Sequence, residues 1–224
     1  MCGRFVQAQS AQSYADHFGA AVSLDEVVDP SWNVAPTDRV YAVAEHEGNR
    51  LLGAFRWGLI PWFAKEAKVG ARHINARAET AATTPAFKDS FARKRCLIPA
   101  DGFYEWEKRE SGGKVPHFVH NADHSPLALA GLWSSWKNPD GERVATCSII
   151  TTRPNDLLAP IHDRMPLILP REAWDRWMDR ETTDPGVLEA LLVPAADETL
   201  AEYPVSTLVN DVKNNYAECV TPLH

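Results

Sequence analysis

Four residues in this chain could act together on a carbonyl group: Cys2, Asn75, Glu105 and His162. Cys2 follows Met1 directly, so we expect removal of Met1 to leave an N-terminal cysteine with a thiol and a free α-amine. The α-amine has an ordinary pKa of roughly 7.7–8.0, so a useful fraction is unprotonated near neutral pH. An unprotonated amine can attack an aldehyde to give an imine. The thiol can then close on the imine carbon and form a five-membered thiazolidine ring.

The carbonyl addition also requires groups that move protons, because the intermediate must lose water. Glu105 lies between Tyr104 and Trp106, whose rings could raise its pKa by excluding water. His162 lies in a loop and could exchange protons near neutral pH. Each residue has a structural alternative: Cys2 as a small strand residue, Glu105 as a solvent-facing carboxylate, and His162 as the partner of Asp163.

Other polar residues could bind a ligand beside these groups. Asn75 could donate a hydrogen bond to an oxyanion, and Arg77 would lie on the same side of an extended segment. Arg4 and Arg164 stand next to the segments of Cys2 and His162, where a guanidinium group could bind phosphate. Asn75 could instead serve a turn, and the arginines could be solvated surface charges.

Aromatic residues follow the second of two predicted hairpin strands. Trp57, Trp62 and Phe63 lie in a stretch interrupted by glycine and proline, which indicates a loop that carries aromatic side chains. Such rings could stack on unpaired nucleic-acid bases, at roughly 1–3 kcal/mol per base. Some of the tryptophans must instead lie in the core.

Composition limits the class of protein. With 224 residues, 45% hydrophobic and 24% charged, the chain is long enough for a large core, and we expect residues 1–224 to form a single domain. No apolar run suggests a membrane span and no signal sequence is evident, so we expect a cytoplasmic protein. The spacing of Cys2, Cys96, Cys147 and Cys219 fits neither zinc ligation nor a disulfide framework, and we expect no metal or cofactor. The net charge of −7 requires any DNA contact to come from a local cluster of arginines.

The pattern of apolar residues predicts an α+β fold, with strands forming a curved antiparallel sheet or open barrel and helices clustered outside the strand block. A helix is expected from Ala11 to Phe18, with Ser10 and Gly19 at its ends, and another is expected to begin at Thr84 and Pro85. Residues 20–38 are expected to be irregular. Beyond the opening strand, the other expected elements are strands at 39–44, 50–57, 95–99, 102–108, 115–120, 127–136, 143–152 and 203–206, and helices at 171–180 and 185–192.

Taken together, these motifs resemble the SRAP family, the SOS response-associated peptidase proteins that recognise abasic sites in single-stranded DNA. The resemblance runs from end to end. It rests on six ordered motifs: Met1-Cys2-Gly3-Arg4-Phe5, Asn33-Val34-Ala35-Pro36-Thr37, Trp57-Gly58-Leu59-Ile60-Pro61, Asn75-Ala76-Arg77-Ala78-Glu79-Thr80, Pro99-Ala100-Asp101-Gly102-Phe103-Tyr104-Glu105-Trp106 and His162-Asp163-Arg164-Met165-Pro166. The chain departs from the family pattern at Trp62-Phe63, where members often carry a small residue followed by tryptophan.

The resemblance implies that Cys2, freed of Met1, forms a stable thiazolidine with the ring-opened sugar of an abasic site. It implies that Asn75, Glu105 and His162 line the reaction site. It further implies that Arg4, Asn33, Arg77 and Arg164 hold the DNA backbone or order the pocket, and a fold of curved antiparallel sheets with flanking helices.

Three functions therefore stand open at the sequence level. The first is covalent capture of abasic sites in single-stranded DNA by a monomer associated with damaged DNA, with some lyase behaviour at the imine stage. The second is a cysteine peptidase with an N-terminal nucleophile, whose activity includes removal of its own Met1. The third is a single-stranded DNA-binding module in which Cys2 is structural.

Overall fold

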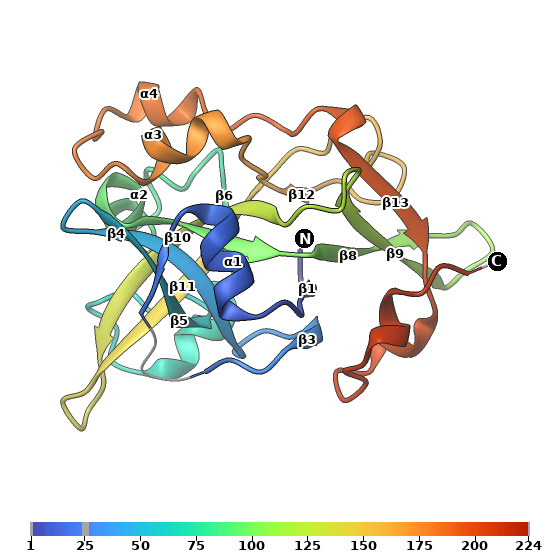
Figure 1. The fold of residues 1–224 in the computed structure, drawn as a ribbon, viewed down its shortest axis with the longest axis horizontal. Coiled ribbons are helices and arrows are strands. Elements are labelled where there is room, and N and C mark those ends of the chain that lie inside the picture. Colours follow the sequence, from blue (N-terminus) through green and yellow to red (C-terminus); the bar gives the residue numbers. More distant parts are fainter. Residues whose placement is uncertain (1, 24–26, 224) are drawn as a thin grey trace.

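The computed structural model describes residues 2–23 and 27–223, and its larger sheet contains a closed barrel of five strands. In the order β5-β4-β7-β10-β11, each strand pairs antiparallel with the next. A parallel pairing of β11 with β5, at Thr146–Arg56 and Cys147–Trp57, closes the barrel. The barrel occupies the left-hand part of Figure 1. Its strands are β4 (Arg39–His46), β5 (Asn49–Trp57), β7 (Arg95–Ala100), β10 (Leu127–Lys137) and β11 (Arg143–Thr152).

A second sheet of five strands extends from the barrel toward the right of Figure 1. Its order is β13-β9-β8-β1-β3, so the N-terminal strand β1 lies inside the sheet with β8 on one side and β3 on the other. The strands are β1 (Phe5–Gln7), β3 (Ser31–Val34), β8 (Gly102–Lys108), β9 (Lys114–Asn121) and β13 (Leu200–Pro204).

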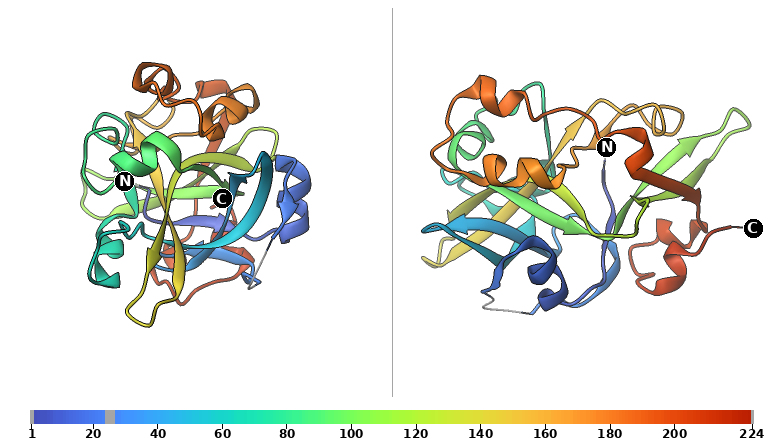
Figure 2. Two further views of the ribbon diagram at one scale, coloured as in Figure 1. Left: turned by 90° about the vertical axis from the view of Figure 1, so that its left-hand side faces the viewer. Right: turned by 45° about the horizontal axis from the view of Figure 1, so that its top comes forward.

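The helices are short and lie outside the strands, with α3 and α4 along one side of the barrel in every view (Figures 1 and 2). The first helix is capped as expected: the Ser10 hydroxyl accepts from the Ser13 amide, and Gly19 ends the helix at φ +62°. Among residues 2–23 and 27–223, no helix combines the length and apolar character needed to cross a membrane. The helices are α1 (Ala11–Phe18), α2 (Lys88–Arg93), α3 (Trp174–Met178) and α4 (Pro185–Glu189), and shorter elements include β2 (Ala21–Val22), β6 (Asn75–Arg77), β12 (Met165–Pro166) and the 3₁₀ turns η1 (Ala67–Arg72) and η4 (Thr207–Asn210).

The predicted α+β class with curved, mostly antiparallel sheets is confirmed, and several expected details change. The expected irregular stretch contains β3, which pairs with β1, and Thr84 does not cap α2, because that helix begins only at Lys88. Trp57 is completely buried at the end of β5, so it cannot stack on a ligand as an exposed loop residue would.

The amide side chain of Gln7 joins the two sheets. Gln7 is 2% exposed, and its side chain exchanges hydrogen bonds with the main chain of Tyr41 on β4: Tyr41 N–H donates to Oε1 at 2.7 Å, and Nε2 donates to the Tyr41 carbonyl at 3.1 Å. Nε2 also donates to the Pro99 carbonyl on β7 at 2.8 Å. The side chain thereby acts as a short extra strand that attaches β1 to the barrel.

Replacing Gln7 with leucine should lower the free energy of unfolding by about 3 kcal/mol, because a buried N–H and two carbonyls lose their partner. Urea denaturation of the wild type and Q7L measures this difference. Gln12→Leu is the matched control, since the Gln12 amide donates to the Asp16 carboxylate at the exposed surface of α1, and its change should stay within about 0.5 kcal/mol. Equal effects of the two substitutions would contradict the joining role of Gln7.

Candidate functional site

Cys2 lies just before β1 and is completely enclosed. Its side chain is 0% exposed and belongs to a buried cluster that includes Phe5, Trp57 and Phe103. Burial, and secondly the charge of Glu105, raise the pKa of the Cys2 thiol well above its ordinary value, so the sulfur is protonated at neutral pH. The short side chain of Cys2 fits into the core where β1 enters it.

Glu105 is placed beside Cys2 by strand pairing. The register that pairs Phe5 with Phe103 continues through the Tyr104 amide, which donates to the Arg4 carbonyl at 3.0 Å, so Glu105 lies alongside the residues that precede Arg4. The carboxyl is 2% exposed, and burial raises its pKa to about 7. Glu105 can therefore hold or release a proton near neutral pH, and it is not the solvent-facing carboxylate of the alternative interpretation.

His162 faces Glu105 from the loop between β11 and β12. Its Nε2 lies 3.9 Å from a Glu105 carboxyl oxygen, and its Nδ1 lies 3.0 Å from the Arg164 amide and 3.0 Å from an Asp163 carboxyl oxygen. Because the amide N–H donates to Nδ1, the neutral ring carries its proton on Nε2, toward Glu105. Burial lowers the pKa of His162, which keeps the ring neutral at physiological pH.

Asn75 contacts Cys2 from the other side. It opens β6, which pairs in parallel with β11, and its Nδ2 donates to the Cys2 carbonyl at 2.7 Å. Its Oδ1 is buried and accepts no hydrogen bond from any residue in the described ranges. This carbonyl oxygen is available to a bound molecule. Arg77 lies two residues along the same strand and is exposed, on the side of β6 that Asn75 occupies, as the sequence predicts.

Arg164 is bound to the protein itself. Its two terminal nitrogens donate to the Glu79 carboxylate at 2.7 and 3.0 Å, and the second also donates to the Thr151 carbonyl. The hydrogen bonds from Arg164 hold the pKa of Glu79 below its ordinary value. This fork ties the His162 loop to the segment after β6, so Arg164 positions two sides of the site. Glu79 was not singled out in the sequence, although it belongs to the Asn75–Thr80 motif.

Arg4 and Asn33 hold the C-terminal segment 207–215. The Arg4 guanidinium donates to Asn33 Oδ1 at 2.8 Å and to the carbonyls of Val209 and Asn210 at 2.8 and 3.3 Å. The Asn33 amide nitrogen donates to the carbonyls of Asp211 and Asn214 at 3.1 and 2.8 Å. These bonds order the surroundings of Cys2. A contact of either residue with DNA stays a prediction.

The two aromatic residues Trp62 and Phe63 are exposed, at 62% and 51%, as expected for a loop that presents its rings to a ligand. Among the histidines outside the site, His120 is 6% exposed and stacks on the exposed His124. Within the part of the chain that the structure describes, no group of three or more His, Cys, Asp or Glu side chains is arranged to hold a metal ion.

The structure thus brings Cys2, Asn75, Glu105 and His162 into one enclosed site, while Trp62 and Phe63 belong to a separate loop. The site offers a titrating carboxyl, a neutral imidazole and an unfilled amide acceptor around a protonated thiol. Such a set can move protons during addition to a carbonyl group. It favours an amine over a thiolate as the first nucleophile, because burial keeps the thiol neutral.

Comparison with known proteins gives consistent results over the whole chain. A family model described as "SOS response associated peptidase (SRAP)" matches residues 1–212. The chain is 42% identical over 221 residues to "Abasic site processing protein YoqW" of Bacillus subtilis, covering 98% of this chain and 99% of that protein. It is 35% identical to "Abasic site processing protein YedK" of Escherichia coli, with both chains fully covered. A crystal structure of a protein from Bacteroides thetaiotaomicron superposes with a TM-score of 0.90 at 25% identity, again over both whole chains.

The raised pKa of Glu105 predicts a specific pH dependence of stability. An unfolded glutamate ionises near pH ~4.3, whereas the folded carboxyl ionises near pH 7, so the folded state loses stability as pH rises from 5 to 8. Glu105→Gln cannot ionise, and its free energy of unfolding relative to wild type should rise by on the order of 3 kcal/mol over this interval. Urea denaturation at pH 5 and pH 8 measures this change.

Glu47→Gln, in the exposed turn between β4 and β5, provides the background effect of removing one surface carboxylate. If E105Q and wild type differed by the same amount at both pH values, the raised pKa would be wrong.

Proposed function

The chain belongs to the SOS response associated peptidase family, and on that premise we propose that it processes abasic sites in DNA through a covalent bond to Cys2. The observation that carries the proposal is the enclosure of Cys2 between Asn75 and the Glu105–His162 pair. The reactive species is the chain that begins at Cys2, whose α-amine attacks C1′ of the ring-opened sugar. In this proposal the carbonyl oxygen of Asn75 orients the amine, because a carbonyl accepts from N–H.

In this scheme Glu105 transfers protons twice, first as an acid and then as a base. Addition of the amine to the aldehyde gives a carbinolamine, with the proton passing from nitrogen to oxygen. Protonated Glu105 then donates to the departing hydroxyl, which leaves as water and produces an iminium ion and a carboxylate. The carboxylate takes the proton of the Cys2 thiol while the sulfur attacks the iminium carbon. The products are a neutral thiazolidine and Glu105 in its starting state, as its pKa of about 7 allows.

His162 assists the carboxyl in this scheme. Its Nε2–H points toward Glu105 and can stabilise the carboxylate formed when water leaves, without carrying a charge of its own beforehand. If the iminium is not captured by sulfur, a proton can be lost from C2′ and the 3′ phosphate eliminated. This is the lyase behaviour that accompanies imine formation on an abasic sugar.

We further propose that the DNA is single-stranded at the lesion and that one chain suffices to bind it. Two features support this: the exposed rings of Trp62 and Phe63 suit stacking on unpaired bases, and residues 56–77 carry five basic residues and one acidic residue. The exposed Arg77 beside Asn75 suits a phosphate at the site. A peptidase that uses the Cys2 thiolate is less well supported, because burial raises the pKa of that thiol.

A crosslinking experiment tests the proposal. The chain, produced so that it begins at Cys2, is mixed with a single-stranded oligonucleotide that contains one abasic site, and the products are separated on a denaturing gel. Wild type should give a stable shifted band. Cys2→Ser keeps the amine but lacks the thiol, so it should give a shifted band only after reduction of the imine with borohydride.

The matched control is Cys219→Ser, a buried cysteine far along the chain whose sulfur lies 3.4 Å from the Asn214 carbonyl; its band should equal that of wild type. Glu105→Gln should slow crosslinking roughly a hundredfold, the lower end of the usual contribution of a positioned acid or base. A stable band in Cys2→Ser without reduction would contradict thiazolidine formation.

The rate of crosslinking should depend on pH with two limbs. Below pH ~7.7 the α-amine becomes protonated, so the rate should fall by up to roughly tenfold per pH unit. Above pH 7 Glu105 loses the proton that it donates to the hydroxyl, and the rate should fall again. Single-turnover rates between pH 5 and pH 9 measure both limbs, and E105Q should lack the alkaline one. A rate that is constant between pH 5 and pH 8 would contradict the assignment.

A further inference from the structure

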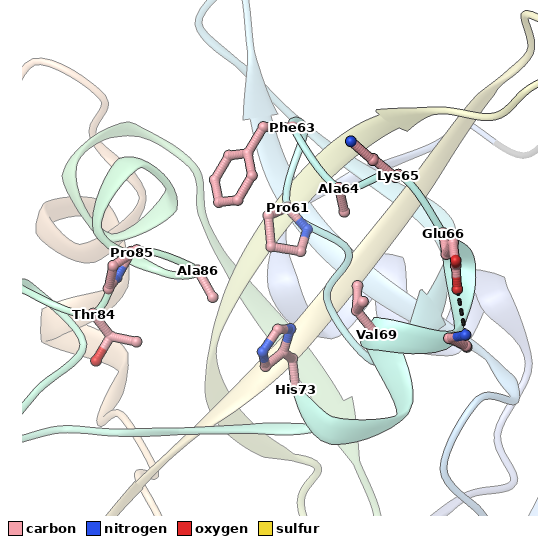
Figure 3. Close-up of a pocket in the computed structure, with 11 residues that line it drawn as sticks. Pro61, Phe63, Ala64, Lys65, Glu66, Val69, His73, Thr84, Pro85 and Ala86 are labelled. Carbon is pink, nitrogen blue, oxygen red and sulfur yellow. Dashed lines mark ion pairs between the residues drawn. The ribbon is translucent and has the colours of Figure 1, made fainter.

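A second pocket, of about 600 Å³, lies between the loop after β5 and the segment before α2. Figure 3 shows Pro61, Phe63 and His73 on one side of it, facing Thr84, Pro85 and Ala86. This volume is in the range of pockets that bind small organic molecules. None of the residues around Cys2 lines it, so the pocket is separate from the site described above.

One wall of the pocket is an aromatic ring held in place but left half exposed. Phe63 is 51% exposed and packs edge-on against Trp62, with ring centroids 5.6 Å apart at 89°. The Trp62 indole N–H donates to the Asp89 carboxylate at 3.0 Å, which anchors the pair to α2. A flat ligand in the pocket would cover the Phe63 ring, which is the favourable step in base–aromatic stacking.

His73 supplies a hydrogen-bond acceptor to the pocket. Its Nδ1 lies 3.2 Å from the Leu59 carbonyl, and the Leu59 amide donates to the His73 carbonyl at 3.1 Å, so the residue is fixed to Leu59 at two points. Since a carbonyl can only accept, Nδ1 carries the proton in the neutral ring, and Nε2 is left as an acceptor. An acceptor between apolar walls matches the N–H group of a planar heterocycle.

The rim of the pocket is basic. Lys65 and Lys68 line it, although Lys68 is paired with Glu66 at 2.5 Å, and residues 56–77 carry a formal charge of +4 in a chain whose net charge is −7. A ligand with a phosphate next to its ring would therefore be attracted to this face. Flat walls, an acceptor and a cationic rim together fit a nucleobase that carries a phosphate.

The pocket is connected to the Cys2 site through Asn75, whose amide donates to the Cys2 carbonyl. His73 is two residues from Asn75, so their Cα atoms are separated by at most about 7 Å, a length that roughly two stacked nucleotides span. Ile74, between them, packs against the buried cluster that contains Cys2. A strand whose abasic sugar reaches Cys2 can place a neighbouring base at this pocket.

We propose that the pocket lined by Phe63 and His73 binds one unpaired base of the damaged strand, a nucleotide or two from the abasic site. This inference rests on the proposed function, because it assumes that the abasic sugar is held at Cys2. The same chemistry would accept a free nucleotide, and the experiment must separate the two sources.

The test removes the base at each position that flanks the abasic site, one position at a time. Oligonucleotides with one reactive abasic site are prepared with an unreactive tetrahydrofuran residue in place of each flanking nucleotide in turn, and single-turnover crosslinking is measured at subsaturating protein. In wild type, one flanking position should slow the reaction about tenfold when its base is missing, the usual contribution of one stacked base. In Phe63→Ala, the intact strand should be slowed by the same factor and the missing base should have no further effect.

His73→Phe, which keeps a ring but lacks the acceptor, should reduce the dependence on that base only in part. Val193→Ala is the control, because Val193 is 59% exposed and lines a different cavity that shares no residue with the Phe63 pocket; it should retain the full dependence. Phe63 is exposed, and circular dichroism of F63A checks that the variant is folded.

The outcomes separate the two claims. If wild type forms no crosslink with any strand, the proposed function fails. If it does, but F63A keeps the full dependence on the flanking base, the base pocket is wrong. Titration with deoxyadenosine 5′-monophosphate, followed by the fluorescence of the neighbouring Trp62, completes the test: binding lost in F63A, with no flanking-base dependence in wild type, would assign the pocket to free nucleotides and overturn the proposal.

Discussion

The hydrogen bonds of the Gln7 side chain determine where the site can form. Cys2 and Arg4 come immediately before β1, so their positions depend on how β1 is attached to the barrel. Gln7 makes this attachment with three hydrogen bonds to main-chain groups of β4 and β7. The bonds lie inside the core, where water is excluded and a hydrogen bond is stronger. On its other side, β1 is paired with β8, the strand that carries Glu105. One short strand therefore places Cys2 against both the barrel and the titrating carboxyl of Glu105.

Burial acts on the two central groups in the same direction and produces a complementary pair. Exclusion of water raises the pKa of the Cys2 thiol and brings the pKa of Glu105 to about 7. A thiol that stays protonated needs a base at the moment it attacks, and a carboxyl that titrates near neutral pH can be that base after it has acted as an acid. His162, kept neutral by its own burial, adds no competing charge.

The sequence predicts the positions of the strands better than it predicts how the strands close into a barrel. The limits of β8 and β11 match the structure, because runs of aromatic and β-branched residues between turn residues identify them. The strand Ser31–Val34 was missed because prolines stand on both sides and only four residues pair. The parallel contact of β11 with β5 has no local signal, since it joins residues about ninety positions apart.

The same distinction holds for the site. The chemistry of their side chains made Cys2, Asn75, Glu105 and His162 candidates, and the resemblance to the SRAP family implied that they line one site. The attachment of Arg4 and Asn33 to segment 207–215 could not be predicted, because the acceptors are main-chain carbonyls, which every residue has. The enclosure of Cys2 depends on packing among residues from β1, β5 and β8, and no single segment of sequence reports it.

The clamp of Arg4 and Asn33 on Val209 to Asn214 also has a consequence for biosynthesis. The hydrogen bond from Arg4 to Val209 joins residues separated by 205 positions, so it cannot form until nearly the whole chain has left the ribosome. Arg4 is therefore synthesised about 200 residues before the clamp that it forms can close. The clamp therefore closes only in a late stage of folding, after its carbonyl acceptors have been synthesised.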